Sequence, residues 1–447
     1  KAELKVGAYA TIDKVFLGSN GINMIAPEVI TQYITPGFSS INLTGGFADY
    51  MKGVEVSIEP VLSFDDMTGK EYTTYIGALY LGGNVGSMSA PGTFDMSFDE
   101  PIVIYSRIVG GCNDANVDTI FASNGTDVLL TPNYKGGLIT RPGSEDDPKV
   151  IININSGRNG NTVRLLPKKL TYDGSTYQLE WNITGTGADA KLVGGNIYGG
   201  CYNSGYINGG VEINILGKAT DTLQVFRTPT LENSGIEKES QLAKVFTKAL
   251  SAFGGGYGED SEIWGSTTIN IDSEGYITQV FGGGEKGIIG KTVAGTDANG
   301  NPNIDENGIY GTVINLRGGR VDKIYGGGYA GLVSGNVRVD LDGGHAGSVF
   351  GGACNADING YSEVFIGLEG FPEITNIYGG NDFGGHIYSK GTHAGYGSAQ
   401  KESNAYVEFF RGNIGNIFGG SYGDYVYSID SSPYYGYDQP CFEASFV

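Results

Sequence analysis

Three histidines are the side chains of this sequence best suited to acid–base chemistry: His345, His386 and His393. An unperturbed imidazole changes its charge near neutral pH, so a histidine beside a carboxylate can exchange a proton with a substrate. His386 and His393 share one stretch with Asp382. If the protein is an enzyme, Asp382, His386 and His393 are the predicted catalytic residues. No nucleophile motif accompanies them, so our first expectation is that the chain carries no catalytic residues.

Aromatic side chains recur in two rows, and an exposed row of this kind could stack against sugar rings. The first row alternates freely between Tyr and Phe, which favours burial; its members are Tyr198, Phe253, Phe281, Tyr325, Phe350, Tyr378 and Phe418. The second row lies beyond the glycine pairs that follow, and consists of Tyr202, Tyr257, Tyr329 and Tyr422. We expect this second row to face solvent and to contact a ligand.

Hard cations such as calcium bind closely spaced oxygen side chains, and one stretch offers them at Asp297, Asn299 and Asp305. However, Pro302 and Gly308 stand where an EF-hand loop needs glycine and glutamate. A polar hairpin is therefore the preferred interpretation, and a calcium site at these three residues is the alternative. No other cofactor is predicted.

A repeated unit must position these residues. An alternating run ends in a glycine pair, and a short aliphatic–aromatic step with a second pair follows, as in residues 312–327 and 337–352. Alternation indicates a half-buried strand, and paired glycines indicate a tight corner. Gly326 and Gly351 are 25 residues apart and Gly351 and Gly379 are 28 apart, with longer intervals elsewhere. Self-similarity at this scale is typical of a solenoid.

The repeat excludes the common alternatives. The leucine framework of leucine-rich repeats and the 3.6-residue pattern of helical repeats are missing, and each unit is too short for a propeller blade. We predict an all-β chain folded as a single-stranded, right-handed parallel β-helix with about 25–28 residues per turn. One short helical insertion is expected at 236–250, where Leu242, Val245, Phe246 and Leu250 are spaced for one helical face.

Residues 1–447 are expected to form one β-helix domain. It would comprise eroded N-terminal turns and a cap at 1–118, regular repeats at 197–423 and a Tyr-rich C-terminal cap at 424–447. Insertions at roughly 285–307 and 382–403 explain two of the long intervals. Both insertions leave after a glycine pair at the same corner, so we expect them to form one binding face.

Asparagine also follows several glycine pairs, at Asn84, Asn113, Asn203, Asn355 and Asn381. Stacked amides can hydrogen-bond to one another along a solenoid. We therefore expect these residues to form a structural ladder.

Composition narrows the class of partner. The chain carries a net charge of −21, which disfavours nucleic acid as a partner. No apolar stretch is long enough to span a membrane.

Cys112, Cys201 and Cys354 follow glycine pairs, and their separations in sequence predict structural thiols several turns apart; the fourth cysteine is Cys441. Because the chain starts at Lys1, we expect that a leader has been removed. The protein is expected to be a monomer.

The runs IYGGGYAG, VFGGAC, IYGGND and IFGGSYGD within 197–423 resemble the Gly-rich repeat proteins of gut Bacteroidetes. That resemblance implies a right-handed β-helix, secreted or anchored at the outer membrane, with a role in adhesion. It carries over no functional residue.

Two functions follow as hypotheses. The first is a non-enzymatic, adhesin-like protein that binds glycans or host or matrix ligands along one face. The alternative is a polysaccharide lyase or glycoside hydrolase of the pectin-lyase-like β-helix type, although Gly344-His345-Ala346 only approaches the Gly-His-Gly motif of such hydrolases. Acidic side chains clustered with Arg or Lys on one open face would favour the enzyme, and a groove lined by tyrosine would favour the adhesin.

Overall fold

The computed structural model describes most of the repetitive part of the chain. It covers residues 191–217 and 248–423, apart from 274–275, 299, 306–309 and 395–399. Before residue 191 it describes mainly 74–87, 92–96, 102–117, 148–155 and 163–186 apart from 166 and 176, with a few isolated strand segments, and at the C-terminal end it describes 445–446. All regular elements in these residues are β-strands, so the predicted all-β class is confirmed for them.

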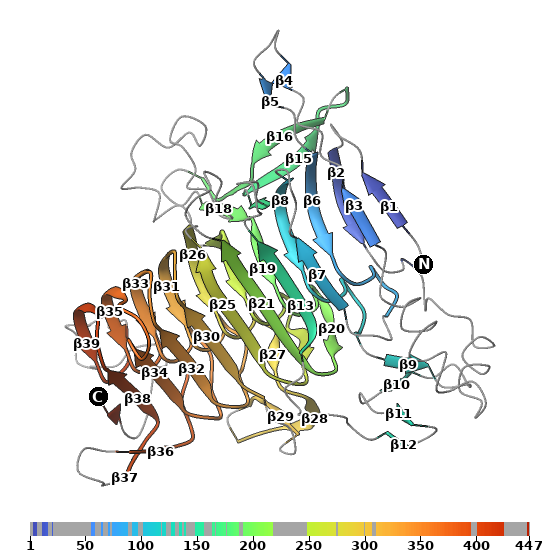
Figure 1. The fold of residues 1–447 in the computed structure, drawn as a ribbon. Coiled ribbons are helices and arrows are strands. Elements are labelled where there is room, and N and C mark those ends of the chain that lie inside the picture. Colours follow the sequence, from blue (N-terminus) through green and yellow to red (C-terminus); the bar gives the residue numbers. More distant parts are fainter. Residues whose placement is uncertain are drawn as a thin grey trace.

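Two long sheets dominate the molecule (Figure 1). One has nine strands, in the order β40 (Ser445–Phe446), β38 (Ala405–Phe409), β34 (Ser362–Ile366), β32 (Val337–Leu341), β30 (Thr312–Leu316), β25 (Thr267–Ser273), β21 (Gly210–Gly217), β13 (Pro148–Asn155) and β7 (Gly92–Met96). The other has eleven strands: β2 (Thr11–Phe16), β6 (Thr74–Tyr80), β8 (Ile102–Val109), β19 (Asn196–Tyr198), β23 (Ser251–Phe253), β26 (Tyr276–Phe281), β31 (Arg320–Tyr325), β33 (His345–Phe350), β35 (Glu373–Tyr378) and β39 (Asn413–Phe418), with β14 (Val163–Leu165) beside β8.

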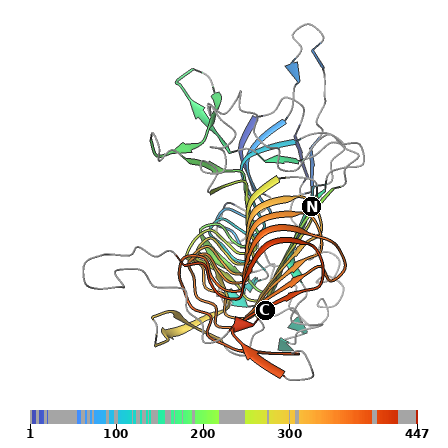
Figure 2. The same ribbon diagram turned by 90° about the vertical axis from the view of Figure 1, so that its left-hand side faces the viewer.

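A third, shorter row completes each repeat. It consists of β20 (Ser204–Ile207), β24 (Asp260–Ile263) and β27 (Ile288–Ile289), and it continues as single bridges through Val333, Ile358 and Ile387. From β21 to β39 the chain visits the nine-stranded sheet, the eleven-stranded sheet and the third row in this constant order. We call one such circuit a pass. All pairing between passes in these rows is parallel, and Figure 2 shows the passes stacked one behind another.

The alternating repeat explains the core. In β30 and β32 every second side chain is buried. The register pairs Ile314 with Val339 and Leu316 with Leu341, so similar aliphatic side chains stack on neighbouring passes. The buried cluster is consequently dominated by Ile, Val and Leu. The glycine pairs are needed where passes approach closely, since a Cβ on Gly326 would lie 2.2 Å from the carbonyl oxygen of Gly351.

A second apolar cluster lies beside this core and is built from the first aromatic row. The rings of Tyr198, Phe253, Phe281, Tyr325, Phe350, Tyr378 and Phe418 stack on successive passes, with centroids 4.6–5.1 Å apart and planes within 8° of parallel. We call these seven rings the aromatic seam. The first five are buried, which confirms their interpretation as core. Phe418, on the last strand of its sheet, is exposed.

The predicted helix at 236–250 falls mostly outside the described residues. Its last three residues are described, and for them the prediction is wrong. Lys248–Ala249 forms β22, which pairs in parallel with β18 (Lys191–Gly194), and Leu250 has a φ of 54°. Ala249 and Leu250 are buried in the core, so tertiary packing overrides the local helical pattern. Within the part of the chain that the structure describes, no helix is long and apolar enough to cross a membrane.

The cysteine spacing was misleading. β8 pairs directly with β19, so Cys112 and Cys201 lie on neighbouring passes, and the amide of Tyr202 donates to the carbonyl of Cys112 (2.8 Å). Between them the chain adds β13 to the nine-stranded sheet and β14 beside β8, so the prediction of several intervening turns is wrong for this pair. It is confirmed for Cys201 and Cys354, which are separated by the passes of β23, β26, β31 and β33. Both thiols are buried, as is Cys354, and burial raises the pKa of the Cys201 thiol. Cys441 lies outside the described residues.

Small peripheral elements surround the long sheets. They comprise the pairs β1 (Glu3–Val6) with β3 (Glu55–Ile58), β4 (Phe64–Asp65) with β5 (Lys70–Glu71), β9 (Thr119–Phe121) with β10 (Asp127–Leu129), β11 (Tyr134–Lys135) with β12 (Leu138–Ile139), β15 (Lys168–Tyr172) with β16 (Tyr177–Trp181), and β17 (Ile183–Thr184) with β18. At the C-terminal end, β40 extends the nine-stranded sheet beside β38, and the rest of the expected cap at 424–447 is outside the described residues.

Two amide ladders run across the passes. Asn113 donates to Asn84 (2.9 Å) and Asn203 donates to Asn113 (3.3 Å), so the expected ladder is confirmed there. Asn381 instead accepts a hydrogen bond from the backbone amide of Ala353 on the preceding pass (2.8 Å) and donates to the carbonyl of Gly384 in its own loop (3.0 Å), so its assignment to the ladder was wrong. The sequence analysis missed a further ladder on the outer face of the nine-stranded sheet. There Asn214 donates to Asn153 (2.8 Å), Asn270 to Asn214 (2.7 Å) and Asn315 to Asn270 (2.7 Å).

Candidate functional site

The second tyrosine row lies against the aromatic seam. Tyr202 and Tyr257 meet the Tyr198 ring edge-on at 5.5 and 5.9 Å, Tyr329 meets Phe281 at 5.9 Å, and Tyr422 meets Tyr378 at 5.4 Å. Three of the four are only half-exposed, whereas Tyr422 is 54% exposed. The expectation of a solvent-facing row therefore holds fully only for Tyr422. Ligand contact by these four residues remains a prediction.

On other passes, carboxylates stand beside the tyrosines of the seam. The Tyr198 hydroxyl donates to Glu285 (2.8 Å), and the Tyr325 hydroxyl donates to Asp382 (2.8 Å). Asp382 is 1% exposed and also lies 3.4 Å from Lys323 Nζ. Burial, together with the nearby carboxylates, raises the pKa of both tyrosines, so each stays a neutral donor. Asp382 is thus a buried partner of the seam.

The other members of the predicted catalytic group have different partners. His386 Nδ1 lies 3.6 Å from Asp357, and His393 Nδ1 lies 3.3 Å from Glu363. His393 belongs to β36 (Gly391–Ala394), which forms a hairpin with β37 (Gln400–Ser403). Each of the three predicted residues is therefore engaged in its own local contact, and the structure assembles no shared acid–base group from them.

His393 has an unusual environment. Its ring stacks on Tyr406 at 3.9 Å and meets Tyr361 edge-on, and its Nε2 is buried without a hydrogen-bond partner. Burial lowers the pKa of His393, against the opposing influence of Glu408. The imidazole is therefore held in its neutral form more strongly than in an unfolded chain.

Beside His393, charged side chains gather on the outer face of the nine-stranded sheet. Arg338 Nε donates to both carboxylate oxygens of Asp340 (2.9 Å), and its guanidinium lies 4.5 Å from the centre of the Phe365 ring. The register places Arg338 opposite Glu363 on the next strand. Burial raises the pKa of Asp340 and of Glu363, and Arg338 opposes both shifts. We call Arg338, Asp340, Glu363 and His393 the charged cluster. Sequence reasoning missed it because it depends on the register between β32 and β34.

A groove of about 680 Å³ lies between the first insertion and the third row. The insertion forms an antiparallel hairpin of β28 (Thr292–Thr296) and β29 (Pro302–Ile304), which confirms the preferred interpretation of this stretch. The groove is lined by polar and aromatic residues that include Asp297, Asn303, Asp305, Tyr310, Asn359 and Tyr388. We call it the hairpin groove.

One partly buried carboxylate fixes the wall of the hairpin groove. Asp357 accepts hydrogen bonds from the backbone amide of His386 (2.8 Å), the Tyr388 hydroxyl (3.1 Å) and the Asn301 side chain (2.8 Å). The His386 ring stacks on Tyr388 with centroids 5.6 Å apart. Tyr388, 39% exposed, is thereby held at the groove before any ligand arrives. Asn301 comes from the first insertion and Tyr388 from the second, so the expectation that both insertions meet on one face is confirmed.

Two of the proposed calcium ligands, Asp297 and Asp305, both line the hairpin groove but have different local contacts. Asp297, near the tip of the hairpin, accepts the backbone amide of Asn301 (2.9 Å), while Asp305 follows β29 at the base, 4.0 Å from Lys291 Nζ. Asn299 lies outside the described residues. Among the side chains that the structure describes, no group of three or more His, Cys, Asp or Glu is arranged to hold a metal ion.

Comparisons with protein-family models, with curated proteins and with solved structures find no match to this chain. The functional argument therefore rests on the geometry of the molecule.

Proposed function

We propose that the passes close into a single-stranded, right-handed parallel β-helix. The constant order of the three rows and their parallel pairing support this closure. Parallel connections within one sheet are right-handed in nearly all proteins, which supports the hand. Residues 1–118 would supply the N-terminal passes and 424–447 the C-terminal cap. Small-angle X-ray scattering tests the closure, because a rod-shaped particle is expected and a spherical one would contradict it.

We further propose that the protein is a non-enzymatic, adhesin-like protein that binds glycans in the hairpin groove. The observation that carries this proposal is the exposed Tyr388 ring, held in place by Asp357 among amide and carboxylate side chains. An aromatic face can pack on the C–H face of a sugar, and fixed polar groups can pair with its hydroxyls. Such a preformed wall lowers the cost of ordering the site on binding.

The charge of the groove selects the class of glycan. Asp297 and Asp305 both line it, the nearby Lys291 lies beside Asp305, and the whole chain carries a charge of −21. An anionic polymer would be repelled from this surface. We therefore infer that the ligand is an uncharged, hydroxyl-rich polysaccharide. Secretion or anchoring at a cell surface, where such polymers are met, belongs to the same proposal. Protease accessibility on intact cells tests it, and a fully protected protein would contradict it.

Binding is tested by affinity electrophoresis against arabinoxylan, mixed-linkage β-glucan and galactomannan, with polygalacturonate as the anionic comparison. At least one neutral polymer should retard the protein more than polygalacturonate does. Tyr388→Ala should weaken that binding about tenfold, because an aromatic contact of about 1.4 kcal/mol corresponds to that factor. Tyr172→Ala is the matched control, since Tyr172 is an exposed tyrosine on β15, away from the groove. Equal retardation of the wild-type protein and both variants would contradict the proposal.

The charged cluster supports a second candidate function, cleavage of polysaccharide. It places Asp340, Glu363 and Arg338 on neighbouring strands of one face, with raised carboxyl pKa values of the kind that general acids require. Release of new reducing ends from the same polymers tests this candidate. Activity that is lost in Glu363→Gln but kept in Tyr388→Ala would replace the adhesin by an enzyme. No release from any polymer would rule the enzyme out for these substrates.

A further inference from the structure

A second groove, larger than the first, crosses the outer face of the eleven-stranded sheet. It has a volume of about 1210 Å³ and spans β31, β33, β35 and β39. One polar side chain from each of these strands stands in register along it: Arg320, His345, Glu373 and Asn413. We call this the strand groove. None of its residues belongs to the hairpin groove, to the charged cluster or to the aromatic seam.

Small side chains form one row of the lining of the strand groove. Gly347, Thr375 and Gly415 occupy this row, two positions after His345, Glu373 and Asn413 on β33, β35 and β39. The four strands repeat a polar position about every 4.8 Å, the spacing of neighbouring strands in a sheet. A linear polymer that runs across the strands would therefore meet an equivalent polar group on each pass.

The lining carries both signs of charge. His345 Nδ1 lies 3.0 Å from Glu373, and Arg320 and Asp322 line the groove beside them. Both side chains of the His345–Glu373 pair are more than half exposed, so they can exchange water for ligand hydroxyls at little cost. Mixed donors and acceptors without a dominant charge suit the same class of ligand as the hairpin groove, an uncharged polysaccharide.

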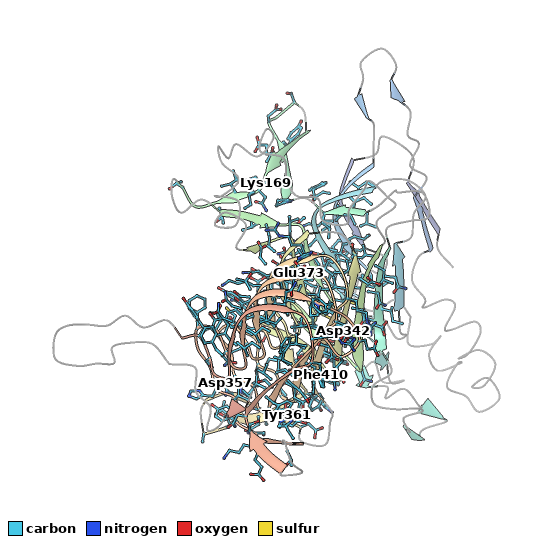
Figure 3. The ribbon with its side chains drawn as sticks, turned by 60° about the vertical axis from the view of Figure 1, so that its left-hand side comes forward. Lys169, Asp342, Asp357, Tyr361, Glu373 and Phe410 are labelled. Carbon is cyan, nitrogen blue, oxygen red and sulfur yellow. The ribbon has the colours of Figure 1, made fainter. Side chains whose placement is uncertain are left out.

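The two grooves face away from each other. Figure 3 places Glu373 on the upper side of the stacked passes and Asp357 on the lower side. The hairpins β28–β29 and β36–β37 lie along that lower side as well (Figures 1 and 2). A ligand in one groove would therefore leave the other accessible.

We infer that the protein binds two chains of an uncharged polysaccharide at once, one in each groove, and so cross-links them. This inference rests on the proposed glycan binding. Rigid presentation of two sites on one molecule converts modest single-site affinity into strong retention on a polymer network. It also gives an adhesin-like protein a mechanical role, because one copy can tie two polymer strands together.

The first test is stoichiometry, measured by isothermal titration with xylohexaose, cellohexaose and mannohexaose. Two hexasaccharides per chain are expected for at least one of them. Thr375→Trp, which places a large ring in the strand groove, should reduce the number to one, and so should Tyr388→Ala. Glu369→Ala is the control, since Glu369 is exposed and lines neither groove. One hexasaccharide per wild-type chain would overturn cross-linking while leaving the proposed glycan binding intact.

The second test is cross-linking itself, measured as light scattering of arabinoxylan, mixed-linkage β-glucan or galactomannan on addition of protein. Wild type should raise the scattering, and both groove variants should fail to do so while still binding. The double variant His345→Ala/Glu373→Ala removes both members of an exposed pair and should behave like Thr375→Trp. Light scattering of the protein alone must show a monomer, because self-association would cross-link through a single groove. A self-associating wild type would overturn the inference, and failure of every polymer to bind would overturn the proposed function with it.

Discussion

The aromatic seam and the hairpin groove are both rich in tyrosine, yet they are built in opposite ways. The seam comes from the repeat: each pass adds one ring, and five of the seven rings are buried. The groove comes from the insertions, where Tyr388 stays exposed and is oriented by Asp357. The difference teaches that regular positions in this chain supply stability, whereas departures from the repeat supply surfaces for ligands.

The largest effect on stability should come from removing one ring of the aromatic seam. Phe281 is fully buried between the rings of Phe253 and Tyr325. Phe281→Ala should lower the free energy of unfolding by about 3–5 kcal/mol, because it leaves a cavity and removes two stacking contacts. Chemical denaturation measures this, with Phe383→Ala, an exposed phenylalanine, as the matched control. A loss as small as that of the control would show that the seam does not stabilise the fold.

A smaller loss is expected at the buried carboxylate. Asp382→Asn removes the charge that accepts the Tyr325 hydroxyl and faces Lys323, so it should cost about 1–3 kcal/mol. Asp260→Asn, at an exposed position, serves as the control. If Asp382→Asn instead kept stability but abolished a polysaccharide-cleaving activity, Asp382 would be a catalytic residue after all.

The second tyrosine row tests whether tyrosines along the repeat stabilise the fold or bind the ligand. Tyr329→Ala should destabilise the protein by about 1 kcal/mol, since its ring meets Phe281 edge-on. Tyr422→Ala should change stability by no more than about 0.5 kcal/mol, because Tyr422 is largely exposed. Neither change should alter retardation by neutral polysaccharides. A marked loss of binding in Tyr329→Ala with unchanged stability would assign the ligand to this row.

The smallest effect concerns pH and the second hairpin. Because the pKa of His393 is lowered in the folded state, the unfolded chain takes up the proton first as the pH falls below about 6.5. The contribution of His393 to stability is therefore present above that pH and declines below it. The Tm of wild type should fall from pH 8 to pH 5 by more than that of His393→Gln. Identical curves for wild type and His393→Gln would contradict this sign.

The sequence predicted those features that repeat. Alternation and glycine pairs identified the strands, the corners and the buried aromatic row, since each is set by local periodicity. The helix at 236–250 failed at its described end because Ala249 and Leu250 are taken into the core beside β18. The separation of Cys112 and Cys201 was overestimated because an interval in sequence does not distinguish several short passes from one long pass.

The candidate site was predicted only in outline. The two insertions and their common face could be read from the spacing of the glycine pairs. The key contact could not, because Asp357 lies in a pass without an insertion and meets Tyr388 and Asn301 only through the register of the third row. The same holds for Arg338 and Glu363, which become neighbours through strand pairing alone.

The most direct test removes the wall of the hairpin groove. Thr292 pairs with Ile304 at the base of the hairpin, so residues 293–303 can be replaced by the two-residue turn Asn-Gly. This variant is made in the Thr375→Trp background, which blocks the strand groove, and its affinity for the three neutral polymers is measured alongside its Tm. An unchanged Tm with loss of binding is the expected result. Undiminished binding by the folded variant would show that the first insertion does not form the ligand surface.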